Sequence, residues 1–116
     1  GTVIHVDEGV PCRIGNHVTV GHRALLHGCT VEDGCLIGMG AIVLDKAVIG
    51  AGSVVGAGAL VTQGKQFPPH SLIIGSPARV VRTLTDEDVQ AIQKGALHYI
   101  ENAQKAMHWR RIDEQH

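Results

Sequence analysis

The sequence predicts a mainly β protein: a parallel β-helix built of short strands, followed by a C-terminal α-helix. Three observations lead to this prediction. An aliphatic residue recurs about every six positions, a small or β-branched residue precedes it by two, and glycine often follows it. A period of six fits neither a helix of 3.6 residues per turn nor the simple alternation of a strand. It fits short strands joined by tight turns, because such turns favour residues that tolerate unusual backbone angles.

The aliphatic positions follow one another in steps of six, with a single step of five between Leu26 and Val31. They are Ile14, Val20, Leu26, Val31, Ile37, Val43, Ile49, Val55 and Val61. This pattern, over about residues 3 to 63, resembles the left-handed hexapeptide β-helix family, whose coil is a triangular prism with three six-residue sides. The resemblance implies that the aliphatic side chains stack inside the prism, with neighbouring strands about 4.8 Å apart.

The composition excludes several classes of function. A chain of 116 residues allows one domain. The net charge of −1 argues against a nucleic-acid or anionic-membrane partner. No apolar run reaches the roughly 20 residues of a membrane span, and no signal-peptide pattern is visible.

The three cysteines, Cys12, Cys29 and Cys35, fall two places before an aliphatic position, in the slot that small inward-facing residues occupy. We expect them to be packed thiols and not metal ligands or nucleophiles, because free cysteine behaves as a small apolar residue. An odd number of cysteines without a secretory signal favours a reducing compartment, and we expect a cytoplasmic protein.

The prolines at 68 and 69 indicate that the β-helix occupies residues 1–65 and that a connector covers 66–84. A helix is expected over 85–109, followed by a tail at 110–116. Thr85 with Asp88 three places later is typical of a helix N-terminus. The apolar stripe of this helix predicts packing along the prism or a neighbouring subunit. It comprises Val89, Ile92, Ala96, Tyr99, Ile100, Ala103 and Met107.

The register of the repeat predicts where three of the eight histidines lie on the prism. His5 and His27 each come directly after an aliphatic residue on the same face, one coil apart, provided that Asp7 to Pro11 bulges out by four residues. Their side chains then point outward within about 5–6 Å of each other. His22 falls on another face, and we expect that face of a threefold partner to lie against the face with His5 and His27. Two imidazoles from one chain and one from the next form the ligand set of a catalytic zinc.

The strings TVIHV at 2–6, VGHRALLHGC at 20–29 and LIGMGAIVLD at 36–45 resemble the gamma-class carbonic anhydrases. The resemblance implies a homotrimer with a metal at each interface, held by residues at the positions of His5, His22 and His27. It implies a lyase that hydrates carbon dioxide to bicarbonate with a metal-bound hydroxide. The metal expected is zinc, although imidazole ligands also suit iron or cobalt.

Two further residues are candidates for roles near the metal. Glu8, three places after His5, either passes protons outward or is an ordinary solvated loop carboxylate. Tyr99 resembles a tyrosine found near the metal in some family members, and a packing role for it is an equal alternative. Segments with which the family supports subunit contacts and orients the hydroxide would precede Gly1, so we expect the chain to be a fragment of a longer protein.

Two other functions stay open at this point. One is a non-catalytic trimeric scaffold or assembly subunit of the same family. The other is a hexapeptide acyltransferase, which shares the β-helix and a connector like GSPARVVR at 75–82. The three histidines favour the metal-binding alternatives, because an acyltransferase needs a single general base.

Overall fold

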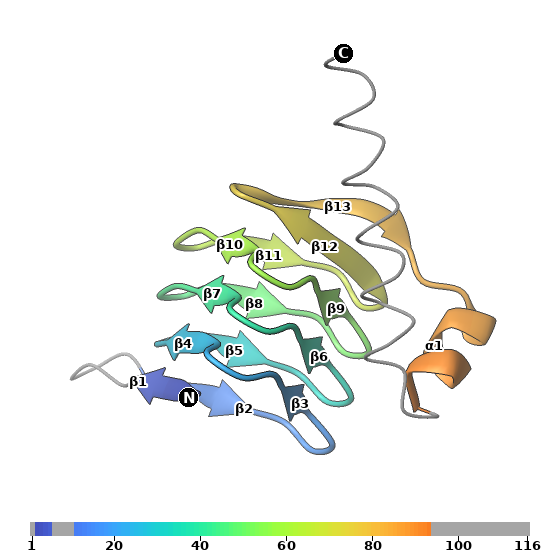
Figure 1. The fold of residues 1–116 in the computed structure, drawn as a ribbon, viewed down its shortest axis with the longest axis horizontal. Helices are drawn as coiled ribbons and strands as arrows, with labels where there is room; N and C mark the ends of the chain where they lie inside the picture. Colours follow the sequence, from blue (N-terminus) through green and yellow to red (C-terminus); the bar gives the residue numbers. More distant parts are fainter. Residues whose placement is uncertain (1, 6–10, 94–116) are drawn as a thin grey trace, which may run out of the picture.

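The computed structural model describes residues 2–5 and 11–93, and its strands form three sheets wound around one axis (Figure 1). Sheet 1 contains β1 (Val3–His5), β4 (Leu25–His27), β7 (Ile42–Val43) and β10 (Leu60–Val61). Sheet 2 contains β2 (Arg13–Ile14), β5 (Thr30–Val31), β8 (Val48–Ile49) and β11 (Gln66–Phe67). Sheet 3 contains β3 (Thr19–Val20), β6 (Leu36–Ile37), β9 (Val54–Val55), β12 (Ser71–Gly75) and β13 (Ala78–Thr83).

Each coil of the chain adds one strand to each sheet, and the strands pair in parallel with the repeat in register. In sheet 1, for example, Leu26 pairs with Val43, and Val43 pairs with Val61. The predicted β-helix followed by a C-terminal α-helix is therefore confirmed. The helix α1 (Asp86–Gln93) lies beside the stacked coils in Figure 1.

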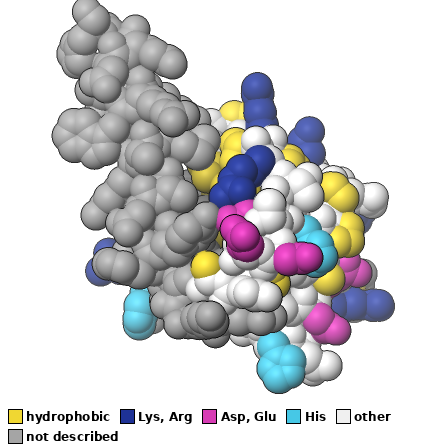
Figure 2. Space-filling view, turned by 90° about the vertical axis from the view of Figure 1, so that its right-hand side faces the viewer, with side chains coloured by type: hydrophobic (Ala, Val, Ile, Leu, Met, Phe, Trp, Pro, Cys, Tyr) yellow, Lys and Arg dark blue, Asp and Glu magenta, His cyan; other side chains and the backbone are white. Residues whose placement is uncertain are grey.

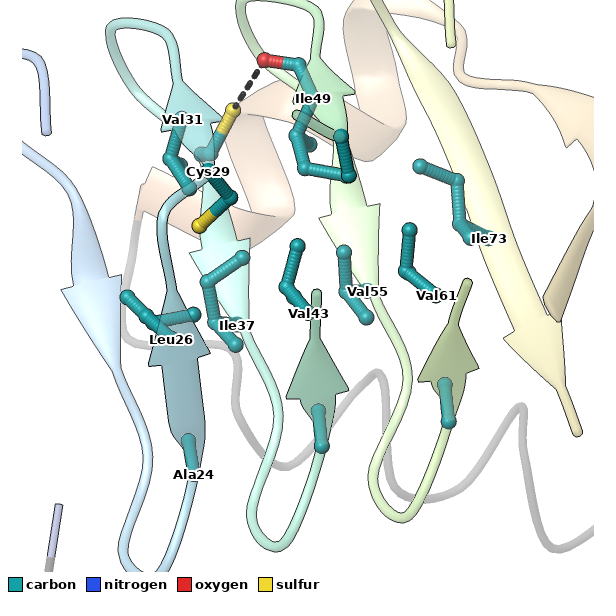
Figure 3. Close-up of a cluster of buried hydrophobic side chains, with 14 of the residues drawn as sticks. Ala24, Leu26, Cys29, Val31, Ile37, Val43, Ile49, Val55, Val61 and Ile73 are labelled. Carbon is teal, nitrogen blue, oxygen red and sulfur yellow. Dashed lines mark hydrogen bonds between the residues drawn. The ribbon is translucent and has the colours of Figure 1, made fainter. Parts of the chain in front are cut away.

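The core of the prism consists of the aliphatic repeat positions, as predicted. Leu26, Val43 and Val61 of sheet 1 are each 0% exposed, and Figure 3 shows them with Ile37 and Val55 between the sheets. Burial of one such side chain contributes about 1.5–3 kcal/mol. The small positions two places earlier are also buried, including Ala24, Cys29, Cys35, Ala41, Ala47, Ser53 and Ala59.

The β-helix extends further along the chain than predicted, and the boundary at residue 65 needs correction. Phe67 pairs with Ile49, and Ile73 pairs with Val55, so β11 and β12 complete a fourth coil. Both residues continue the six-residue step after Val61, Phe67 partly buried against the core and Ile73 fully buried. Pro68 and Pro69 fall between the strands, where they interrupt no ladder hydrogen bonds of the sheet.

After it completes the fourth coil, β12 also pairs with β13 in an antiparallel manner. The helix α1 then begins with the predicted cap. The Asp88 backbone N–H donates to the Thr85 hydroxyl at 3.2 Å, and the Asp88 carboxylate accepts from the Thr85 N–H at 2.9 Å and from Arg82 at 2.6 Å. Of the helix expected over 85–109, the structure describes the part up to Gln93. The later residues of the predicted stripe lie outside the described residues.

The outer side of sheet 3 carries a second apolar cluster. Leu84 and Val89 pack there against the outward side chains of sheet 3, namely Leu36, Val54 and Leu72. This part of the chain therefore covers the outer side of β6, β9 and β12, whereas His27 lies at the end of β4 in sheet 1.

Two surface properties bear on the expected partners. In the described part of the chain, no helix has the length and apolar character that crossing a membrane requires. On the face shown in Figure 2, acidic and basic side chains of the described residues are interspersed, as expected from the near-zero net charge. Such a mixed distribution gives this face no extended surface of one sign.

Candidate metal centre

The pairing of β1 with β4 places His5 opposite His27 on adjacent coils of sheet 1. Eight residues separate Ile4 from Arg13 in the first coil, whereas four separate the equivalent Val43 and Val48 of the third coil. The first coil thus has four additional residues at this corner, which confirms the predicted number. The side chain of His5 is outside the described part of the structure, so the distance between the two imidazoles stays a prediction.

His22 lies in the turn between β3 and β4, at the corner where sheet 3 meets sheet 1. The turn is stacked on the next coil, since the His22 carbonyl accepts the N–H of Gly40 at 2.9 Å. Gly21 allows this close approach, because a Cβ at residue 21 would come within 2.7 Å of the Met39 nitrogen. Arg23 completes the turn with a φ of 61°. The result is a histidine side chain exposed at the edge of the prism.

The outer side of sheet 3, which the sequence predicts to face a partner subunit, is partly covered by the same chain. The outward residues of sheet 3 at Leu36, Val54 and Leu72 are already covered by Leu84 and Val89 of the same chain. The corner beside sheet 3, which contains His22, is exposed. The contact between subunits itself stays a prediction.

His27 is a half-buried imidazole with a carboxylate partner on the next coil. Its Nδ1 forms a hydrogen bond with Oδ1 of Asp45, in the turn that follows β7. The side chains of His27 and Asp45 are 24% and 26% exposed. Gly28, with a φ of 57°, turns the chain directly after His27, where the repeat is one residue short. Metal-ligating histidines commonly donate their second ring N–H to such a carboxylate.

Asp45 is a residue of the site that the sequence analysis missed. The signal was present, because the six-residue register places residues 44 and 45 on the coil directly after His27. The acidic residue that this register places beside His27 is Asp45.

The surroundings of His27 on sheet 1 are apolar. The outward positions Val3, Leu25, Ile42 and Leu60 form one row across the four strands of the sheet. Val3 is 49% exposed, and the other three are partly buried. An aliphatic row of this kind on the outside of a solenoid is typical of a surface that contacts another protein.

The cysteines have the environment of packed thiols. Cys29 and Cys35 are buried, and the Sγ atoms of Cys12 and Cys29 lie 3.8 Å apart. Burial, assisted by the neighbouring Cys12, raises the pKa of the Cys29 thiol to about 12, and burial also raises the pKa of Cys35. Since the thiolate is the form that attacks or binds metals, these shifts favour the predicted packing role for Cys29 and Cys35.

The remaining candidates, Glu8 and Tyr99, lie outside the described residues. Among the residues that the structure describes, no three side chains of His, Cys, Asp or Glu in a single chain come together to hold a metal. The donor chemistry of the described residues nevertheless fits a metal. His27 has the carboxylate partner typical of a ligand, and His22 is exposed at the corner between sheets 3 and 1.

The three-sheet solenoid and its six-residue repeat define a hexapeptide-repeat protein. The family model described as bacterial transferase hexapeptide (six repeats) matches residues 28–63. A crystal structure from Bacillus cereus, provisionally described as an acetyltransferase, has a TM-score of 0.78 and 43% identity, covering 90% of this chain and 61% of that one.

Two curated relatives are more specific. The protein named "Probable carbonic anhydrase" of Methanocaldococcus jannaschii is 51% identical over 98 residues, which are 84% of this chain and 62% of that protein. "Gamma carbonic anhydrase 2, mitochondrial" of Arabidopsis thaliana is 43% identical over 109 residues, 89% of this chain and 39% of that protein. The chain belongs to the gamma-class carbonic anhydrase family. It spans less than two thirds of the length of either relative.

Proposed function

We propose that the chain belongs to a metal-dependent carbonic anhydrase whose metal lies between subunits of a homotrimer. The ligands are His5 and His27 of one subunit and His22 of the partner subunit. The observation that carries the proposal is the in-register pairing of His5 with His27 on sheet 1. Two outward positions of one sheet, a coil apart, are near enough for both side chains to reach one ion.

The residues of the chain have distinct parts in this function. Asp45 holds the His27 ring, the turn between β3 and β4 presents His22 to a neighbour, and the aliphatic row of sheet 1 excludes water beside the site. The same row is suited to carbon dioxide, which is small and apolar. A metal with three neutral imidazole ligands would supply an acidified water that reacts with carbon dioxide near neutral pH. Zinc is the metal proposed, and the packed thiols favour a reducing compartment such as the cytoplasm.

The proposal is tested on the full-length protein by its zinc content and by stopped-flow hydration of carbon dioxide. We expect close to one zinc per chain, and the His27→Asn variant should lose most of it. His17→Asn is the matched control, because His17 is an exposed turn residue with a φ of 57°, which asparagine tolerates. A wild-type protein that takes up no metal would contradict the proposal.

The similarity to solved transferase structures supports a second candidate, an acyltransferase. A perosamine N-acetyltransferase from Caulobacter crescentus, solved with CoA and GDP-perosamine, is 35% identical with a TM-score of 0.58 over 61% of this chain. Calorimetric titration with acetyl-CoA separates the two functions, since the carbonic anhydrase proposal expects no binding. Zinc binding without hydration of carbon dioxide would instead identify a non-catalytic scaffold subunit.

A further inference from the structure

We propose that Asp45 is a positioning residue that fixes the proton of His27 on Nδ1, so that Nε2 is the nitrogen directed to the metal. The inference rests on the proposed function and deepens it. It concerns a residue outside the three predicted ligands, and the chemistry follows from the contact between the His27 ring and the Asp45 carboxylate.

The pairing of the backbone determines where Asp45 lies. The strands β4 and β7 pair in register, with Leu26 opposite Val43, and Asp45 is the second residue after β7. Backbone hydrogen bonds hold its turn on both sides. The Lys46 N–H donates to the Gly28 carbonyl, and the Gly64 N–H donates to the Asp45 carbonyl, each at 2.9 Å. The backbone of residue 45 is therefore fixed by the stacking of three coils, and its carboxylate contacts the His27 ring from that position.

The chemistry of the Asp45 carboxylate and the His27 ring determines which ring nitrogen has the proton. An ionised carboxylate only accepts hydrogen bonds, and a neutral imidazole has a single N–H. The hydrogen bond to Asp45 therefore places that N–H on Nδ1 and the lone pair on Nε2. With both side chains about three-quarters buried, the bond is partly shielded from competing water.

The turn that contains Asp45 has an equivalent turn on the next coil. The stacked turn above Asp45 has Gln63 at the equivalent position, followed by Gly64 where the third coil has Lys46. Lys46 and Gly64 share the left-handed conformation, with φ of 64° and 75°. The same turn thus forms without an aspartate. The carboxylate occurs on the coil that lies next to His27.

The tautomer of His27 is the direct test. Long-range ¹H–¹⁵N correlation spectra of the metal-free, full-length protein are recorded at a pH above the titration of imidazole. We expect the Nδ1–H tautomer for His27 in the wild type and a shift toward Nε2–H in Asp45→Ala. The control Gln63→Ala, at the equivalent turn position, should leave the tautomer unchanged. A wild-type His27 with its proton on Nε2 would overturn the inference.

The second readout is zinc affinity, measured with a competing chelator. Asp45→Ala should weaken zinc binding about 10- to 100-fold, while Gln63→Ala keeps the wild-type affinity. Equal affinities of wild type and Asp45→Ala would refute the positioning role and leave the proposed function standing. A wild type without zinc would instead contradict the proposed function, and the tautomer would still decide whether Asp45 holds the His27 proton.

Discussion

The inner and outer rows of sheet 1 share one backbone register but follow different sequence rules. The inner row is aliphatic in every coil: Ile4, Leu26, Val43 and Val61. The outer residues that follow them are His5, His27, Leu44 and Thr62. The stacking of coils constrains the inner row, because each side chain packs on the equivalent residue above and below. This outer row, distinct from the aliphatic outward row of Val3, Leu25, Ile42 and Leu60, has no such constraint, and there the chain carries imidazoles at two of four positions.

The largest expected difference between the inner and outer rows comes from substituting two adjacent residues of β4, one in each row. Leu26→Ala should lower the free energy of unfolding by about 2–5 kcal/mol, because it leaves a cavity at a fully buried position. His27→Ala should lower it by about 1 kcal/mol, the net value of the hydrogen bond to Asp45. Urea denaturation of both variants measures the difference. Equal losses would show that the outer row is as constrained as the inner row.

A second test mixes subunits to determine whether the histidines that bind one metal come from two chains. His22→Asn and His27→Asn trimers should each lose zinc, since every interface then lacks one ligand. After unfolding and refolding together, about a quarter of the interface sites would receive intact residues from both subunits in a ring of three. Zinc content of the mixed sample measures this recovery. No recovery in demonstrably mixed trimers would count against ligands from two chains.

The smallest expected effect concerns a thiol of the interior. Burial raises the pKa of Cys35 above its usual value of 9.0, so the native state keeps the proton that the unfolded chain loses. The stabilising contribution is complete below that value and declines as the pH rises through the native pKa. Unfolding curves at increasing pH should show this decline in the wild type and less of it in Cys35→Ala. An identical pH dependence of the two proteins would mean that the Cys35 thiol is ionised equally in both states.

The six-residue spacing was sufficient to predict the fold, and it also placed His5 opposite His27, because each strand has one register that buries its aliphatic residue. The end of the β-helix was missed for a local reason. Phe67 replaces an aliphatic residue, Lys65 occupies a small-residue position, and the prolines fall in a turn. The apolar stripe predicted that the helix with Val89 packs along the prism or a neighbouring subunit. It did not predict that Leu84 and Val89 pack on sheet 3, because sequence spacing does not give which face is covered.

The proposed function requires a metal held by two histidines of one chain and one from its neighbour. Anomalous diffraction at the zinc absorption edge, from crystals of the zinc-loaded full-length protein, locates that metal. We predict a peak about 2.0–2.1 Å from imidazole nitrogens of His5 and His27 of one subunit and His22 of the partner subunit. A zinc bound elsewhere, or a trimer in which residues 5, 22 and 27 remain too far apart to share an ion, would contradict it.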